Sequence, residues 1–195
     1  IMLSKIDENL KMLETLETKR SQLKLNDDHL NAIESMANDC MQFGTIPFSV
    51  LARHGFIAKS LLDSIIALGI LTTEDVERFQ KTIPTVATEF IKDLNKFSQG
   101  QLEKKDIINN YGHLRPGTYD ILSIPYKKRD DLIIKEKHVQ KIDENNAEFE
   151  LSRKQEAEIK VLLQEHGFSI GPEFLFDYIR RSIQAREYSK FKECF

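Results

Sequence analysis

The residues best suited to chemistry lie in one run, Tyr111-Gly112-His113-Leu114-Arg115-Pro116-Gly117-Thr118-Tyr119-Asp120, which has no apolar period. Its glycines permit positive φ, and Pro116 fixes its own φ and moves Arg115 away from the helical region. The run therefore predicts a loop of defined shape with displayed side chains. A guanidinium, an imidazole and a carboxylate in such a loop suit a zwitterionic or phosphorylated ligand, because arginine offers paired planar donors to carboxylate or phosphate groups.

The same run also fits a structural role. A helix that ends near Tyr111 needs a C-terminal cap and a turn, and His113 and Arg115 can donate to nearby carbonyl groups. The residues alone leave both interpretations open.

A second polar pair, Arg53 and His54, interrupts a stretch whose other helical faces are largely apolar. A helix there is expected to bury Arg53, and an unpaired buried guanidinium costs on the order of several kcal/mol. We therefore expect either an Asp or Glu of this chain, or an anionic ligand, next to Arg53. The residues leave both partners open.

Three more arginines, Arg180, Arg181 and Arg186, lie near the C-terminus on an expected helix. Arg180 and Arg186 are separated by roughly 240° around a helix axis, so they are expected to face different ways. We expect these arginines to make surface or interhelix contacts rather than to bind a ligand.

Composition excludes several classes of protein. The chain has 195 residues, 41% of them apolar, and a net charge of −3, which gives no bulk attraction to nucleic acid or to an anionic membrane. No apolar run approaches the roughly 20 residues that span a bilayer, and the N-terminal residues do not resemble a signal peptide. We therefore expect a cytoplasmic protein that binds neither nucleic acid nor membrane. The 2 cysteines and 5 histidines show no metal-ligand spacing, so no metal site is predicted.

Apolar periodicity predicts helices along most of the chain. One stripe runs from Leu3 to Leu16 at steps of three and four residues. A second helix is expected after an N-cap at Asn26 and ends at Gly44, and a third begins near Pro47. Further helices are expected from Thr72, after Pro84, over 102–110, from Ser152 and from Pro172 onward.

These elements predict a mainly α fold, an irregular multi-helix domain with a long loop region around 111–150. Within this single domain we expect a helical hairpin over 1–42, a helical core over 43–110, the motif loop and an irregular segment over 111–150, and C-terminal helices over 151–195. The amphipathic pattern has no cap before Phe195, which favours a piece of a larger protein.

Four segments together resemble the central region of phosphoenolpyruvate-synthase-like phosphotransferases. They are Pro-Phe-Ser-Val-Leu-Ala-Arg-His-Gly-Phe-Ile-Ala at 47–58, Thr-Val-Ala-Thr-Glu-Phe at 85–90, the Tyr111 run through Ile121, and the stretch 174–191. The order of the segments also matches, and they cover most of the chain from Phe43 onward. These motifs are similar to those of rifampin phosphotransferases. The residues Leu-Arg-Pro-Gly-Thr-Tyr-Asp are also similar to the L-glutamine kinase of capsule phosphoramidate synthesis.

The resemblance implies an enzyme of three domains. In that family an ATP-grasp domain phosphorylates a histidine on a swivelling domain, and the phosphohistidine then visits a second site where the acceptor waits. ATP and Mg²⁺ are expected for the full-length enzyme, and no cofactor is expected in this segment, which has neither the nucleotide-binding nor the swivel motif. The implied partners are a small-molecule acceptor, such as L-glutamine or a related metabolite, and the other two domains of the same chain.

Position in the motifs also implies roles for individual residues. Arg53, His54, Arg115 and Tyr119 are expected to bind the acceptor or the phosphoryl group, and His113 or Asp120 to act as the general base, with His54 as an alternative. Of these, the five residues other than Tyr119 are expected to converge on one polar concavity. The short polar loop favours a small acceptor over a bulky one.

Two other classes of protein compete with this interpretation. One is a non-catalytic helical scaffold that spaces two catalytic domains. The other is a partner-binding bundle that uses the Leu3 to Leu16 stripe as an exposed interface, and it loses support if that stripe packs within the chain.

Overall fold

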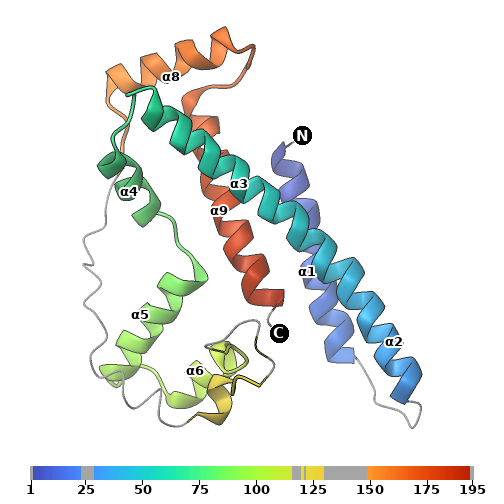
Figure 1. The fold of residues 1–195 in the computed structure, drawn as a ribbon. Helices are drawn as coiled ribbons and strands as arrows, with labels where there is room; N and C mark the ends of the chain where they lie inside the picture. The colour runs from blue at the N-terminus through green and yellow to red at the C-terminus, as the bar shows by residue number, and fades with distance from the viewer. Residues whose placement is uncertain (1, 23–28, 116–119, 121, 130–148, 194–195) are drawn as a thin grey trace. The chain divides into compact units, whose positions relative to one another are not determined.

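The computed structural model describes residues 2–22, 29–115, 120, 122–129 and 149–193. All regular elements in these residues are helices (Figure 1), which confirms the mainly α fold. The chain forms two compact units: unit 1 holds residues 1–83 and 146–190, and unit 2 holds 84–145 and 191–195. No helix in the described ranges has both the length and the apolar character needed to cross a membrane. Membership of a larger three-domain enzyme stays a prediction.

Unit 1 is built around a core to which most of its helices contribute. These are α1 (Met2–Gln22), α3 (Ile46–Ala67), α4 (Thr73–Lys81), α8 (Arg153–Glu165) and α9 (Pro172–Glu193) up to residue 190. Their fully buried side chains include Ile6, Leu51, Leu62, Phe79, Ile159 and Ile179. The apolar faces predicted from periodicity are thus the surfaces that hold unit 1 together.

The Leu3 to Leu16 stripe of α1 lies inside unit 1. Ile6 and Leu13 are 0% and 2% exposed, and Leu3 and Leu10 pack against the same core. The stripe is therefore not an exposed interface, and a partner-binding bundle built on it loses its support.

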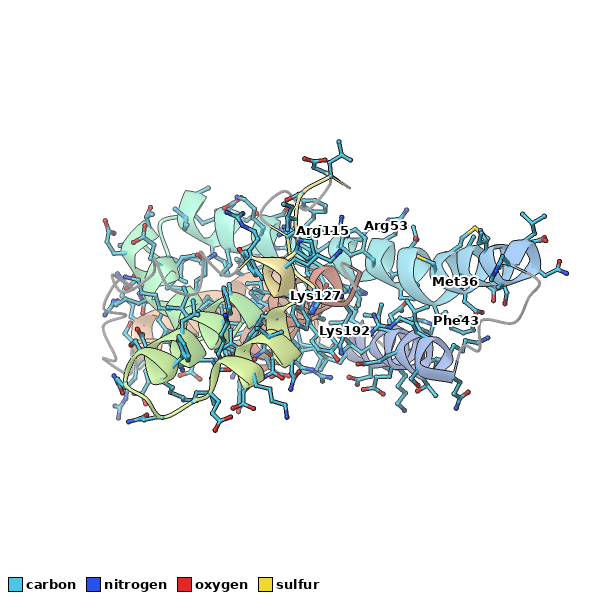
Figure 2. All side chains as sticks on the ribbon, turned by 90° about the horizontal axis from the view of Figure 1, so that it is seen from below. Met36, Phe43, Arg53, Arg115, Lys127 and Lys192 are labelled. Atoms are coloured by element: carbon cyan, nitrogen blue, oxygen red, sulfur yellow. The ribbon has the colours of Figure 1, made fainter. Side chains whose placement is uncertain are left out.

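Exposed apolar residues are found instead at several places in the described ranges, among them α2 (His29–Cys40), which buries none of its side chains. Leu30, Ile33 and Met36 are all exposed, whereas the neighbouring face meets α1 through a 2.9 Å ion pair between Asp39 and Lys19. Figure 2 labels Met36 on this helix. The expected N-cap at Asn26 lies outside the described residues.

The expected break between the second and third helices is wrong. A π-helical turn, η1 (Met41–Thr45), joins α2 to α3 in one continuous helix (Figure 1), and the amide of Ile46 donates to the carbonyl of Met41. Pro47 has no amide hydrogen, and in a regular α-helix its ring would clash with the carbonyl one turn earlier. The wider π-turn accommodates the proline without ending the helix. Gly44 does not end the helix. It is buried, and a Cβ there would lie 3.1 Å from the side chain of Leu16.

A capping box at Thr72 begins α4, as the sequence predicts. The amide of Asp75 donates to Thr72 Oγ1, and the amide of Thr72 donates to Asp75 Oδ2, both at 3.1 Å. The Thr72 amide and the Arg78 guanidinium hold the pKa of Asp75 below its usual value. Gln155 of α8 donates to the same carboxylate at 3.3 Å, so this cap also ties α4 to α8.

Three arginines of α9 contact three different helices of unit 1. Arg180 lies over the ring of Phe79 at 5.5 Å, Arg186 lies over Phe56 at 5.3 Å, and Arg181 forms an ion pair with Asp7. This confirms that Arg180 and Arg186 face different ways. All three side chains serve interhelix contacts.

Unit 2 is smaller and contains the motif loop. Its elements in the described residues are α5 (Val86–Ser98), α6 (Lys104–Tyr111) and a 3₁₀ turn, η2 (Tyr126–Lys128). The division after Pro84 is confirmed, because α4 ends at Lys81 and a capping box between Thr85 and Thr88 begins α5. The core consists of Leu94, Ile107 and Tyr111 with several partly buried aromatic rings around them.

Candidate functional site

The motif run begins on a tyrosine that is anchored in the core of unit 2. Tyr111 is 6% exposed, and its hydroxyl donates to Asp93 Oδ2 at 2.9 Å. Burial, with the Asp93 carboxylate beside it, raises the pKa of the Tyr111 hydroxyl well above its usual value. The ring of Phe90 lies 4.6 Å away. Tyr111 is therefore a structural anchor that fixes where the run leaves α6.

Gly112 is required for space rather than for an unusual backbone conformation. Its φ of −62° is open to any residue, so a positive φ is not the reason for glycine here. A Cβ at this position would clash with the carbonyl oxygen of Ile108 and lie 3.0 Å from Cβ of Lys127. Only glycine lets the turn after α6 lie this close to η2.

Two backbone hydrogen bonds then fix the run against η2. The amide of Lys127 donates to the carbonyl of Gly112, and the amide of Tyr126 donates to the carbonyl of Leu114, each at 2.9 Å. The ring of Tyr126 also stacks on Phe90, with centroids 5.9 Å apart and an interplanar angle of 14°. The backbone between Tyr111 and Leu114 is thus held at several points, as expected for a loop of defined shape.

His113 lies in this fixed segment. Its ring meets Phe191 edge-on at 4.8 Å, and its Nε2 is buried. Arg115, which follows the last fixed residue, is partly exposed. Figure 2 labels Arg115 and Lys127. These two cationic residues of unit 2 belong to the two segments that the backbone hydrogen bonds join, the motif run and η2.

Asp120 is exposed, and its Oδ1 accepts the amide of Leu122 at 2.9 Å. Its carbonyl accepts the amide of Ser123 at 3.0 Å, so Asp120 begins a turn that leads back to η2. Tyr119, Pro116 and Gly117 lie outside the described residues.

The prediction that Arg53 is buried is wrong. Arg53 is exposed, and no carboxylate of the described residues lies within ion-pair distance of it. The buried face of α3 consists of Leu51, Gly55 and Ala58, and Arg53 lies off that face. No carboxylate among the described residues is therefore the structural partner of Arg53.

His54 behaves differently from Arg53, because it is partly buried against α9. Its Nδ1 lies 2.9 Å from the hydroxyl of Tyr178, and the two rings meet edge-on with centroids 5.8 Å apart. Burial lowers the pKa of His54, so the imidazole is neutral near pH 7. Burial also raises the pKa of Tyr178, which stays protonated.

Comparison with protein-family models, curated proteins and solved structures finds no match to this chain. The resemblance to phosphoenolpyruvate-synthase-like enzymes therefore stays a prediction from the motifs.

The described candidate residues fall into two sets. Arg53 and His54 belong to unit 1, and His113, Arg115 and Asp120 belong to unit 2. Convergence of the two sets on one site stays a prediction. Among the described residues no group of three or more His, Cys, Asp or Glu side chains could hold a metal ion.

Sequence reasoning missed Tyr178 and Lys127. Tyr178 is 124 positions from His54, and no local pattern links them. Lys127 belongs to a charged run that is typical of a solvent-exposed surface. Its backbone hydrogen bond to Gly112 is what places it beside the motif.

Proposed function

We propose that this chain is the acceptor-binding region of an ATP-dependent phosphotransferase that works through a phosphohistidine relay. The acceptor is a small polar molecule with a carboxylate or phosphate group, and L-glutamine is the first candidate. The proposal is supported by the four motif segments and by the geometry of residues 111–114, which are fixed by contacts within unit 2.

One observation carries the proposal. Arg115 directly follows a backbone segment that is bonded to η2 through Gly112 and Leu114. An arginine presented from a fixed backbone loses less conformational entropy on binding than one on a mobile loop. Its planar guanidinium can then grip two oxygens of a carboxylate or phosphoryl group at once.

The chemistry asked of these residues is positioning and neutralisation of charge. Phosphoryl transfer spreads negative charge over three equatorial oxygens, which cationic and N–H donors stabilise without covalent chemistry. We assign this role to Arg115 and Arg53. Arg53 is exposed and has no carboxylate partner in the described residues, so its guanidinium is open to an anionic ligand.

The base that takes the proton of the acceptor is assigned first to Asp120. Its side chain is exposed and uses Oδ1 to hold the Leu122 amide, whereas Nε2 of His113 is buried. His113 is then a residue that shapes the loop through its contact with Phe191.

The two half-reactions of the parent gene product test this proposal. Radiolabelled ATP follows formation of the phosphohistidine, and product analysis follows transfer to L-glutamine and related acceptors. Arg115→Ala should impair transfer by about 10- to 150-fold and leave phosphohistidine formation intact, because a charge-assisted contact is worth roughly 1.5–3 kcal/mol.

Lys128→Ala is the matched control, because Lys128 is an exposed cation of the same unit outside the motif run. It should leave both steps unchanged. A parent protein that forms no phosphohistidine from ATP would refute the proposed enzyme class. Equal loss of both steps in Arg115→Ala would give Arg115 a structural role instead.

A further inference from the structure

Where α3 crosses α9, the polar pair His54 and Tyr178 lies beside the apolar core of unit 1. The helices approach closely at Gly55, where a Cβ would lie 2.6 Å from Cδ of Arg186. Next to this glycine, His54 meets the hydroxyl of Tyr178, which is 3% exposed. Nε2 of His54 has no hydrogen-bond partner among the described residues. This nitrogen is not fully buried.

The direction of the hydrogen bond between His54 and Tyr178 can be inferred from the burial of the tyrosine. Tyr178 is 3% exposed, and Nδ1 of His54 lies 2.9 Å from its hydroxyl. Ser182, one turn later on α9, is fully buried, and its Oγ has no hydrogen-bond partner among the described residues, so it does not accept from Tyr178. Nδ1 of His54 is therefore the acceptor available to the tyrosine hydrogen.

Two arrangements of the hydrogens are conceivable. If Nδ1–H of His54 donated to Tyr178, the tyrosine hydrogen would be buried with no acceptor, which is strongly destabilising. In the reverse arrangement Tyr178 donates to Nδ1 of His54. The tyrosine hydrogen then has an acceptor, and the imidazole proton lies on Nε2, the nitrogen that stays open.

We propose that Tyr178 is a positioning residue that holds His54 in the Nε2–H tautomer, so that α3 presents a neutral N–H donor to an anionic ligand group. Arg53, the residue before His54, adds a positive charge from an adjacent exposed position. The ligand role rests on the proposed function, whereas the tautomer and its dependence on Tyr178 do not.

Nitrogen-15 spectra of the histidine rings in the 195-residue chain test the tautomer at pH 7.5. His54→Gln identifies the His54 signals. The wild-type chain should show a proton on Nε2 and an Nδ1 signal displaced by an accepted hydrogen bond. Tyr178→Phe keeps the ring contact but removes the hydroxyl, so the Nδ1 signal should move and the Nδ1–H form should increase.

Tyr188→Phe removes from the same helix a hydroxyl other than the one that hydrogen-bonds His54, and it should leave these signals unchanged. A wild-type chain that carries the proton on Nδ1 would overturn the proposal. An Nδ1 signal that is identical in Tyr178→Phe and wild type would also overturn it. Thermal unfolding of each variant verifies that the chain is folded in the comparison.

Inorganic phosphate is the probe for the ligand role. Saturable displacement of the His54 Nε2 signal is expected, with the affinity lowered about 2- to 10-fold in Tyr178→Phe. No response at His54, while Arg115 still responds to L-glutamine, would overturn the ligand role of His54 alone. Responses at neither residue would instead count against the proposed function, and the tautomer result would stand.

Discussion

The amide of Lys127 donates to the carbonyl of Gly112 at 2.9 Å, and a Cβ on Gly112 would lie 3.0 Å from Cβ of Lys127. This contact joins the start of the motif run to the turn that follows it, although the residues between them carry no regular structure in the described part of the chain. The shape of the candidate site therefore depends on a position that holds no functional group.

Gly112→Ala should disturb this pairing. The added methyl group would clash with backbone at Ile108, which cannot move without distorting α6, and overpacking of this kind costs about 1–3 kcal/mol. Urea unfolding should show the loss, and exchange of the Lys127 amide should become faster. Gly171→Ala is the control, because no atom lies within 4 Å of a Cβ there and its φ is not positive. Equal stability of both variants would contradict the assigned role of Gly112.

Much of this fold could be predicted from sequence because it follows local rules. Periodicity identified the buried stripe of α1, and the capping residues Thr72 and Ser152 marked the starts of α4 and α8. Gly44 and Pro47 misled the prediction, because each usually ends or begins a helix. In the structure the helix continues through a π-turn, and Gly44 serves the close approach of Leu16 instead.

The candidate site was less predictable than the fold. Arg53 lies near apolar residues in sequence, but Phe56 and Ile57 are themselves exposed, so apolar neighbours did not imply burial. The partner of His54 comes from a helix 124 positions away, and such a contact leaves no trace in a single sequence. The motif run was recognisable because its glycines, proline and charged residues are adjacent.

Arg53→Ala separates a ligand role from a structural one. Because Arg53 is exposed and has no carboxylate partner among the described residues, its loss should change the free energy of unfolding by no more than about 0.5 kcal/mol. Binding of phosphate or acceptor should weaken in the same variant. Unfolding measured by denaturant and binding measured by calorimetry test both parts. A markedly destabilised variant would mean that Arg53 supports the fold.

The stability of unit 1 should fall at mildly acidic pH because of His54. Burial lowers its pKa from 6.5, so the unfolded chain binds the proton more readily than the folded one. The stabilisation is fully present above pH 6.5 and is lost as the pH falls through the lower pKa of the folded state. Between pH 8 and 5 the unfolding midpoint of the wild type should therefore drop more than that of His54→Gln.

His29→Gln is the control for this measurement, because His29 is exposed at the start of α2. Its pH profile should follow the wild type. Parallel profiles for wild type and His54→Gln would show that protonation of His54 is not coupled to folding.

Titration of the 195-residue chain with L-glutamine and with inorganic phosphate, observed at the backbone amides, tests the central claim most directly. The account predicts saturable shifts at Gly112 to Arg115, an affinity lowered about 10- to 150-fold by Arg115→Ala and partly restored by Arg115→Lys, and no change in Lys128→Ala. Wild-type affinity in Arg115→Ala, or shifts confined to residues outside this run, would contradict the assignment of the acceptor site.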